Sequence, residues 1–173
     1  MKKRLLSAFM ALALCLTLVP TAALAEGTAE NVAEVTIGSA TTQYDDIDAA
    51  FAAAQQAGSA TVKLLANVTT TSEIKVVSGT FTIDLNGRKW EGTDTHTLMV
   101  SGGNVTVTST DGVGTITCSS HNAIYVDSGA TVHVKSGVRL NQLYTMKNAK
   151  LTLDVGVIIT VKFFTQADNI APF

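Results

Sequence analysis

The side chains that could carry acid–base chemistry in this chain are few, and their spacing is unfavourable. Asp84 and Asp154 lie on similar strand-like segments and form the candidate pair of carboxylates. The repeats described below place them three coils apart, which is about 14 Å at the spacing of neighbouring strands. Glycosidases need two carboxylates about 5 to 9.5 Å apart. The pair therefore does not predict a glycosidase, and we assign no catalytic residue.

The histidines and the cysteine do not predict a metal site. His96 and His121 lie in polar loops and His133 lies on a strand face, without the spacing of zinc ligands. The acidic residues form no calcium-binding loop. We therefore expect neither a metal nor a cofactor. Cys118 is the only cysteine after residue 25, and its inward position predicts a buried structural thiol.

One column of outward side chains is the candidate ligand-binding site. Lys75, Met99 and Tyr125 occupy the same position in three similar strand segments, so the fold should place them side by side. A sugar ring could stack on Tyr125, with Lys75 flanking it. Ordinary cross-strand packing explains the same column, because such pairs stabilise any sheet. Both interpretations stay open at this point.

Repeated segments supply the elements that would position this column. A first strand type reads VKLLANV (62–68), FTIDLNG (81–87), VTVTST (105–110), VHVKSG (132–137) and LTLDVG (151–156). A second type reads IKVVSG (74–79), LMVSGG (98–103), IYVDSG (124–129) and YTMKNA (144–149). A weaker third stretch follows in residues 116–118, 138–140 and 158–161. This recurring order predicts a solenoid of about four to five coils, a right-handed parallel β-helix. The alternative is an antiparallel β-sandwich.

Alternation along these strands predicts which side chains face the core. The expected core residues are Phe81, Ile83, Leu85, Val105, Val107, Val132, Val134, Leu151, Leu153, Val155, Ile74, Val76, Leu98, Val100, Ile124, Val126, Tyr144 and Met146. The expected outward columns include Thr82, Thr106, His133, Thr152 and, beside them, Asp84, Thr108, Lys135, Asp154. Lys135 and Asp154 should form an exposed ion pair, which contributes little. Asn67 and Asn86 occupy matching turn positions and should stack as a ladder.

The segment before the coils predicts a small hairpin and one helix over residues 34–59. Gly38 and Ser39 are turn residues after a short strand. Asp45 can cap the helix that follows, and Gly58 suits its end. The apolar face of that helix is expected to be Ile47, Ala50, Phe51 and Ala54.

The N-terminus has the composition of a secretion signal over residues 1–25. A basic start (Lys2, Lys3, Arg4) precedes an apolar run and an A-x-A site ending at Ala25. Cleavage there would leave 9 basic and 14 acidic residues, a net charge of −5. That charge disfavours nucleic acid and anionic membranes as partners. We expect an extracellular or cell-surface chain without a stable membrane span, with residues 26–33 as a leader.

The coils, expected over residues 60–164, end without a visible lid. Residues 157–164 are apolar and strand-like, and residues 165–173 form a short tail. An uncapped solenoid end exposes unpaired backbone. The chain could be a fragment, the tail could fold back, or the end could pair with another chain in self-association. We favour the fragment interpretation.

Three longer segments carry a resemblance to a known family. YDDIDAAFAAAQQAGSATVKLLANV (44–68), FTIDLNGRKWEG (81–92) and AIYVDSGATVHVKSG (123–137) resemble bacterial secreted proteins with a pectate-lyase-like right-handed parallel β-helix. The resemblance implies a fold and no chemistry, because that fold hosts lyases, hydrolases, adhesins and stalks. No catalytic residue can be carried over by motif. The expected function is a secreted or cell-surface, non-catalytic β-helix module, adhesin-like or structural, contacting glycans or proteins. The alternative is a carbohydrate-active enzyme, a pectate-lyase-like lyase or hydrolase, or a fragment of one.

Overall fold

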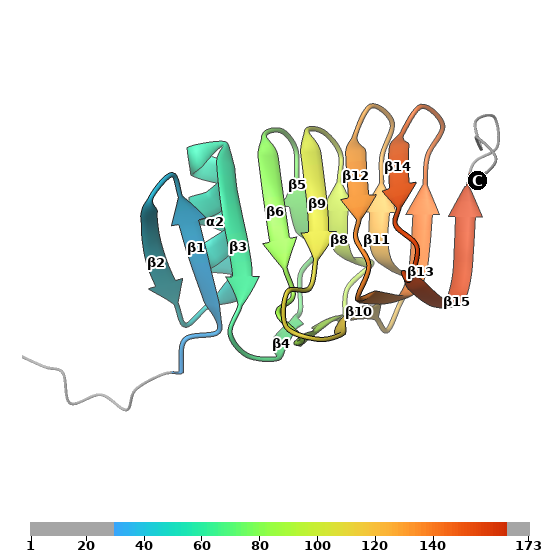
Figure 1. Ribbon diagram of the computed structural model, residues 1–173. Helices are drawn as coiled ribbons and strands as arrows, with labels where there is room; N and C mark the ends of the chain where they lie inside the picture. The colour runs from blue at the N-terminus through green and yellow to red at the C-terminus, as the bar shows by residue number, and fades with distance from the viewer. Residues whose placement is uncertain (1–29, 166–173) are drawn as a thin grey trace, which may run out of the picture.

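The computed structural model describes residues 30–165. The predicted signal peptide, residues 26–29 of the leader and residues 166–173 of the tail lie outside the described residues. The fold opens with a hairpin of β1 (Ala33–Ile37) and β2 (Ala40–Tyr44), followed by helix α2 (Ile47–Ala57). Five coils of strands come next, stacked side by side in Figure 1. The structure therefore has one helix and one continuous solenoid in this part of the chain.

Each coil contributes short strands to three faces. The first face consists of β3 (Ser59–Leu64), β6 (Thr80–Asp84), β9 (Asn104–Thr108), β12 (Thr131–Val134) and β14 (Lys150–Leu153). The second face consists of β4 (Val68–Thr70), β7 (Lys89–Gly92), β10 (Gly114–Cys118) and the first half of β13 (Val138–Thr145). The third face consists of β5 (Ile74–Val76), β8 (His96–Val100), β11 (Asn122–Val126) and the second half of β13. Strand β15 (Ile158–Thr165) pairs with both halves of β13.

All strand pairs between successive coils are parallel. On the first face, Thr82 pairs with Thr106, and Thr106 pairs with His133. The second and third faces are parallel in the same way. This pairing confirms the predicted parallel β-helix and excludes the antiparallel sandwich. The handedness of the coil remains a prediction.

The residue that caps the N-terminus of α2 differs from the predicted one. The N-cap of α2 is Asp46, whose carboxylate accepts a hydrogen bond of 2.8 Å from the backbone N–H of Ala49. Asp45 was expected in this role, but it lies one residue too early to reach the free N–H groups of the first turn. The helix ends at Gly58 in a left-handed conformation, as predicted.

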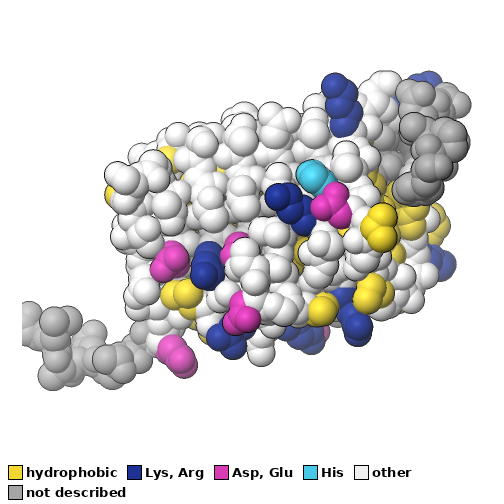
Figure 2. Space-filling model, viewed as in Figure 1, with side chains coloured by type: hydrophobic (Ala, Val, Ile, Leu, Met, Phe, Trp, Pro, Cys, Tyr) yellow, Lys and Arg dark blue, Asp and Glu magenta, His cyan; other side chains and the backbone are white. Residues whose placement is uncertain are grey.

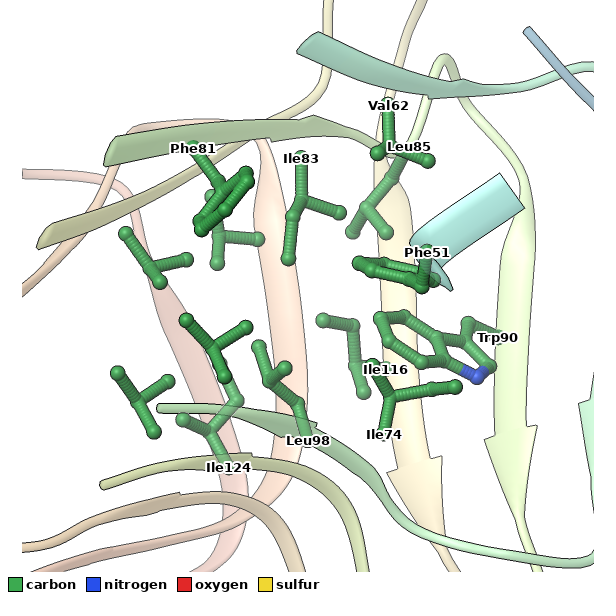
Figure 3. Packing of buried hydrophobic residues seen from close by; sticks show 14 of the residues in the cluster. Phe51, Val62, Ile74, Phe81, Ile83, Leu85, Trp90, Leu98, Ile116 and Ile124 are labelled. Carbon is green, nitrogen blue, oxygen red and sulfur yellow. The ribbon is translucent and has the colours of Figure 1, made fainter. Parts of the chain in front are cut away.

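Helix α2 closes the N-terminal end of the core. Its predicted apolar face, Ile47, Ala50, Phe51 and Ala54, is buried. The Phe51 ring stacks on Trp90 of the second coil at 5.3 Å between centroids, and Figure 3 shows the two rings lying against each other. The Trp90 indole N–H donates to the Thr70 hydroxyl at 3.3 Å, which satisfies the buried polar atom. The sequence patterns had not assigned Trp90 to the core.

The register of the first coil is offset from the predicted one. Val62 pairs with Ile83, whereas the sequence repeats aligned it with Phe81. An offset of two positions keeps every side chain on its face, so the core prediction survives. The predicted asparagine ladder does not form. Asn86 donates instead to the Leu64 carbonyl at 2.9 Å, and Asn67 accepts from the backbone N–H of Lys89 at 2.8 Å.

The largest correction lies on the third face of the fourth coil. Tyr144 and Met146 were expected inside, but Leu143 and Thr145 are the buried residues there. Ile124 pairs with Leu143, whereas the sequence repeats aligned it with Tyr144. A slip of one position moves every side chain to the opposite face. Tyr144 therefore points outward, next to Tyr125.

The last coil is incompletely covered. Leu151 and Leu153 are only half-buried, although they face inward as predicted. Val155 was expected in the core, but it is 98% exposed because β14 ends at Leu153 and the chain turns at Gly156. Phe163 pairs with the buried Leu143 and is still 41% exposed. The described end of the solenoid therefore presents inward-facing side chains without a further coil over them.

Candidate functional site

The candidate site is a continuous outward column on the third face, which we call the aromatic column (Lys75, Met99, Tyr125, Tyr144 and Phe164). Lys75 pairs with Met99, and Met99 pairs with Tyr125, as the sequence predicted. Tyr125 pairs with Tyr144, and Tyr144 pairs with Phe164. Each member comes from a different coil, so the column runs along the axis of the solenoid.

The rings of the aromatic column stack on one another along that axis. Tyr125 and Tyr144 lie parallel, 5.3 Å between centroids and 1° between planes. On the opposite side, His96 stacks on Tyr125 at 4.6 Å and 17°. Phe164 lies 6.1 Å from Tyr144 and is tilted by 43°. His96, from the start of β8, thus extends the stack, although it was expected to be a solvated loop residue.

This stacking decides which part of Tyr125 a ligand could reach. His96 and Tyr144 come from the coils before and after Tyr125, so they cover opposite faces of its ring. A sugar that stacks on an aromatic ring needs a free face. A ligand could therefore contact only the ring edge and the hydroxyl group of Tyr125. Burial, then Asp127 and Tyr144, raise the pKa of the Tyr125 hydroxyl above its ordinary value of 10.0. The hydroxyl is a hydrogen-bond donor near neutral pH.

His96 joins the column to a polar loop. Its Nδ1 lies 3.3 Å from the side-chain amide nitrogen of Asn122, which can donate to it. The His121 ring lies edge-on at 6.4 Å. Burial is the largest influence and lowers the pKa of His96 below its ordinary value of 6.5, while Glu73 and Asp94 oppose that shift. The neutral form is thus favoured, which suits a ring stacked between coils.

The carboxylate of Asp84 is occupied by the fold. It was expected to face outward, but it is 5% exposed. Its Oδ1 accepts from the backbone N–H groups of Asn86 and Thr110, both at 2.9 Å, and its Oδ2 accepts from the Thr110 hydroxyl at 2.6 Å. Asp84 therefore ties the turn after β6 to the turn after β9. Alternation of side chains along the strand predicted a surface carboxylate. It could not predict that the turn after β9 places Thr110 against Asp84.

Asp154 is engaged by a histidine. The sequence predicted Lys135 as its ion-pair partner, but the side chain within hydrogen-bond distance is His133, at 2.6 Å between Nε2 and Oδ1. His133 lies on β12, and Asp154 directly follows β14, the neighbouring strand. The hydrogen bond from His133 is the main cause that lowers the pKa of Asp154, with Lys135 a small contribution. The paired strands also keep Asp84 and Asp154 three coils apart, as predicted.

The remaining features of the described chain are weaker candidates for a functional site than the aromatic column. Cys118 is buried, as predicted, and its thiol lies 3.1 Å from the Asp94 carbonyl. No cluster of three His, Cys, Asp or Glu side chains within residues 30–165 could hold a metal ion. A shallow hollow of about 210 Å³ over β3 and β6 is lined mainly by hydroxyl side chains, including Thr61 and Thr82. No helix in the described part of the chain is long and apolar enough to cross a membrane.

Sequence reasoning found three members of the aromatic column and missed Tyr144 and Phe164. It also missed His96, which stacks on Tyr125. A signal for Tyr144 was present. On the first face, Val132 pairs with Leu151, as the repeats predicted. The same sequence separation carried to the third face places Leu143 under Ile124, and hence Tyr144 beside Tyr125. For His96 there was no comparable signal, because His96 pairs with Asn122 and not with Tyr125, on which its ring stacks.

Fold and site together define a parallel β-helix with a helical lid at its N-terminal end and an aromatic column along one face. Comparison with protein-family models, with curated proteins and with solved structures finds no match for this chain. The function must therefore be argued from the site itself.

Proposed function

We propose that this chain is an exported, non-catalytic β-helix module that contacts a glycan or a protein surface through its aromatic column. The column is the observation that carries the proposal. It spans five coils on one regular sheet face, and its rings are held by their neighbours at 4.6 to 6.1 Å. Contact with a rigid face loses little side-chain entropy on binding, because the rings are already ordered.

The contact chemistry follows from the stacking. Tyr125 and Tyr144 present hydroxyl groups and ring edges at a repeat of one coil, about 4.8 Å. Lys75 and Met99 extend the face with a cation and a polarisable side chain. Such a strip suits an extended partner with regularly spaced hydroxyl or carbonyl groups lying along the axis. Asp84 also supports the proposal, because hydrogen bonds from Asn86 and Thr110 already occupy its carboxylate.

A hydroxyl-deletion experiment tests this function. The chain without residues 1–25 is run in affinity gels that contain a soluble glucan, xylan, polygalacturonate or mucin. We expect retardation in at least one gel, and about thirtyfold weaker retardation for Tyr125→Phe/Tyr144→Phe, which loses two hydrogen bonds of about 1 kcal/mol each but keeps the stack. Thr82→Val/Thr106→Val on the first face is the matched control. Equal retardation of the Tyr→Phe variant, or none in any gel, would contradict the proposal.

The same preparations separate the module from the enzyme alternative. Incubation with polygalacturonate and calcium should release no unsaturated sugar. Release that disappears in Asp154→Asn would replace the proposal by a lyase. Export is tested separately: expression with the full N-terminus in a secreting host should yield a chain that begins at Glu26, by mass spectrometry of the culture medium.

A further inference from the structure

The two ends of the described fold differ in charge and in polarity. Residues 30–58, which form the hairpin and α2, hold five acidic residues and no basic one, a net charge of −5. Residues 131–165, which form the last two coils, hold five basic residues and one acidic one, a net charge of +4. The overall negative charge of the chain therefore hides a dipole along the solenoid axis. Each end attracts the opposite end of another copy and repels its own kind.

Exposed apolar side chains are concentrated at the basic end. Of the eight large hydrophobic residues that are exposed in the described chain, five lie between residues 155 and 164. They are Val155, Ile158, Val161, Phe163 and Phe164. Figure 2 shows hydrophobic side chains gathered at this end of the molecule. These residues lie on β15 and on the turn before it, and exposed apolar side chains gathered at one end mark an interaction surface more often than scattered ones do.

Strand direction makes the opposite ends compatible. β1 is antiparallel to both β2 and β3, so β2 runs in the same direction as β3 and all later strands of the first face. In Figure 1, β2 and β14 point the same way at the two edges of this sheet. Among the described strands, β14 and β2 are the two outer strands of this sheet, so the outer edge of β14 in one copy can pair with the outer edge of β2 in the next copy as another parallel pair. The two strands have similar lengths, four and five residues.

The acidic end also offers a surface that the apolar group can use. The outer side of α2 exposes small side chains, among them Ala49 and Ala52, and Ile37 of β1 is 41% exposed. Small side chains let a neighbouring element approach closely. A contact between two basic ends would bring +4 against +4 and would join the β14 strands as an antiparallel pair. The charges thus favour the head-to-tail arrangement over the tail-to-tail one.

We propose that copies of this chain associate head to tail, with β14 and β15 of one copy against β2 and α2 of the next. Because the two contacting surfaces are different, the contact does not close on itself at two copies. It generates rings or open filaments. The filament would continue the first-face sheet from copy to copy. This inference needs no ligand, and it shares only Phe164 with the aromatic column.

Complementary end variants test the arrangement. Lys150→Glu/Val161→Glu/Lys162→Glu alters the basic end, and Thr42→Lys/Asp45→Lys/Asp48→Lys alters the acidic end. By sedimentation velocity, the unaltered chain should exceed the mass of a dimer as concentration rises, each variant alone should be a monomer, and a mixture of the two should form a dimer. Lys63→Glu/Arg88→Glu, which changes charge between the ends and outside the aromatic column, should behave like the unaltered chain. Association should weaken at least about tenfold between low and high salt, as screening of the opposed ends requires.

Each other outcome overturns the proposal. A dimer formed by the acidic-end variant alone would show tail-to-tail contact. Association that begins only after residues 166–173 are removed would show that the tail covers the end. A monomer under all conditions would show that neither end pairs. If circular dichroism shows that a charge variant is unfolded, Thr42→Cys and Thr152→Cys chains replace it: oxidation should cross-link one with the other, and the absence of that mixed product would sink the idea.

Discussion

Tyr125 and Tyr144 stand side by side on adjacent coils with their ring planes 1° from parallel and their centroids 5.3 Å apart. The pair exists because Leu143 occupies the core position beneath Ile124, which turns Tyr144 to the outer face. The two rings therefore report the register of the fourth coil directly. A change that shifted the register by one position, so that Ile124 paired with Tyr144, would separate the two rings.

The stacking of these two rings predicts a measurable coupling. Tyr125→Ala and Tyr144→Ala should each lower the free energy of unfolding, and the double variant should lose less than the sum by about 0.5 to 1.5 kcal/mol. Urea denaturation of the four proteins measures this. Met99→Ala combined with Tyr144→Ala is the control, because these residues lie two coils apart and should be additive. A Tyr125–Tyr144 coupling near zero would contradict the stack.

The buried carboxylate of Asp84 predicts a large loss of stability on truncation. Asp84→Ala leaves the backbone N–H groups of Asn86 and Thr110 without their acceptor, which should lower the free energy of unfolding by about 2 to 4 kcal/mol. Asp84→Asn keeps one acceptor oxygen and should lose less. Asp111→Ala, at an exposed aspartate of the neighbouring turn, should change stability by less than about 0.5 kcal/mol. Comparable losses for Asp84→Ala and Asp111→Ala in urea denaturation would rule out this role.

The turn at Gly87 predicts a severe effect of one added methyl group. Gly87 has φ +71°, and a Cβ there would collide with the backbone carbonyl oxygen of Asp111. Gly87→Ala should therefore cost more than the roughly 1 to 2 kcal/mol expected for a left-handed residue alone. Gly38→Ala is the matched control, since Gly38 has φ +61° in open space. Thermal denaturation of both variants should show the larger drop in Tm for Gly87→Ala, and the reverse order would refute the close approach.

The pKa of His96 predicts a loss of stability in mild acid. Because burial lowers this pKa in the folded chain, the unfolded chain binds the proton more readily. Stability from His96 is therefore fully present above pH 6.5 and falls as the pH drops below that value. His96→Phe keeps a ring in the stack and removes the titration, so its Tm should fall less than that of the unaltered chain between neutral pH and about pH 5. Identical pH profiles would show that His96 does not titrate as the structure requires.

Features that depend on residues close together in the chain could be predicted from the sequence, and features that depend on contacts between coils were predicted less well. The cores of β6, β9 and β12 follow from residues such as Ile83, Val107 and Val134, because alternation of side chains along a strand is local. The capping face of α2 follows from a local period in the same way. Predictions that joined two coils were less secure. Asp154 forms a hydrogen bond with His133 and not the ion pair expected with Lys135, and Asn67 and Asn86 do not stack.

The sequence by itself determined the strand periodicity, the turns that end each strand, and hence a stacked coil with one helical lid. The tertiary structure alone decided which residue of each strand pairs with which residue of the strand in the next coil. Turn lengths differ between coils, so the sequence separation of paired residues changes along the solenoid: Val132 pairs with Val105 on one side and with Leu151 on the other. A slip of one position sends Tyr144 from the core to the surface. Register is set by packing and hydrogen bonding between segments far apart in the chain. The aromatic column, the buried Asp84 and the opposed charges of the two ends all depend on that stacking.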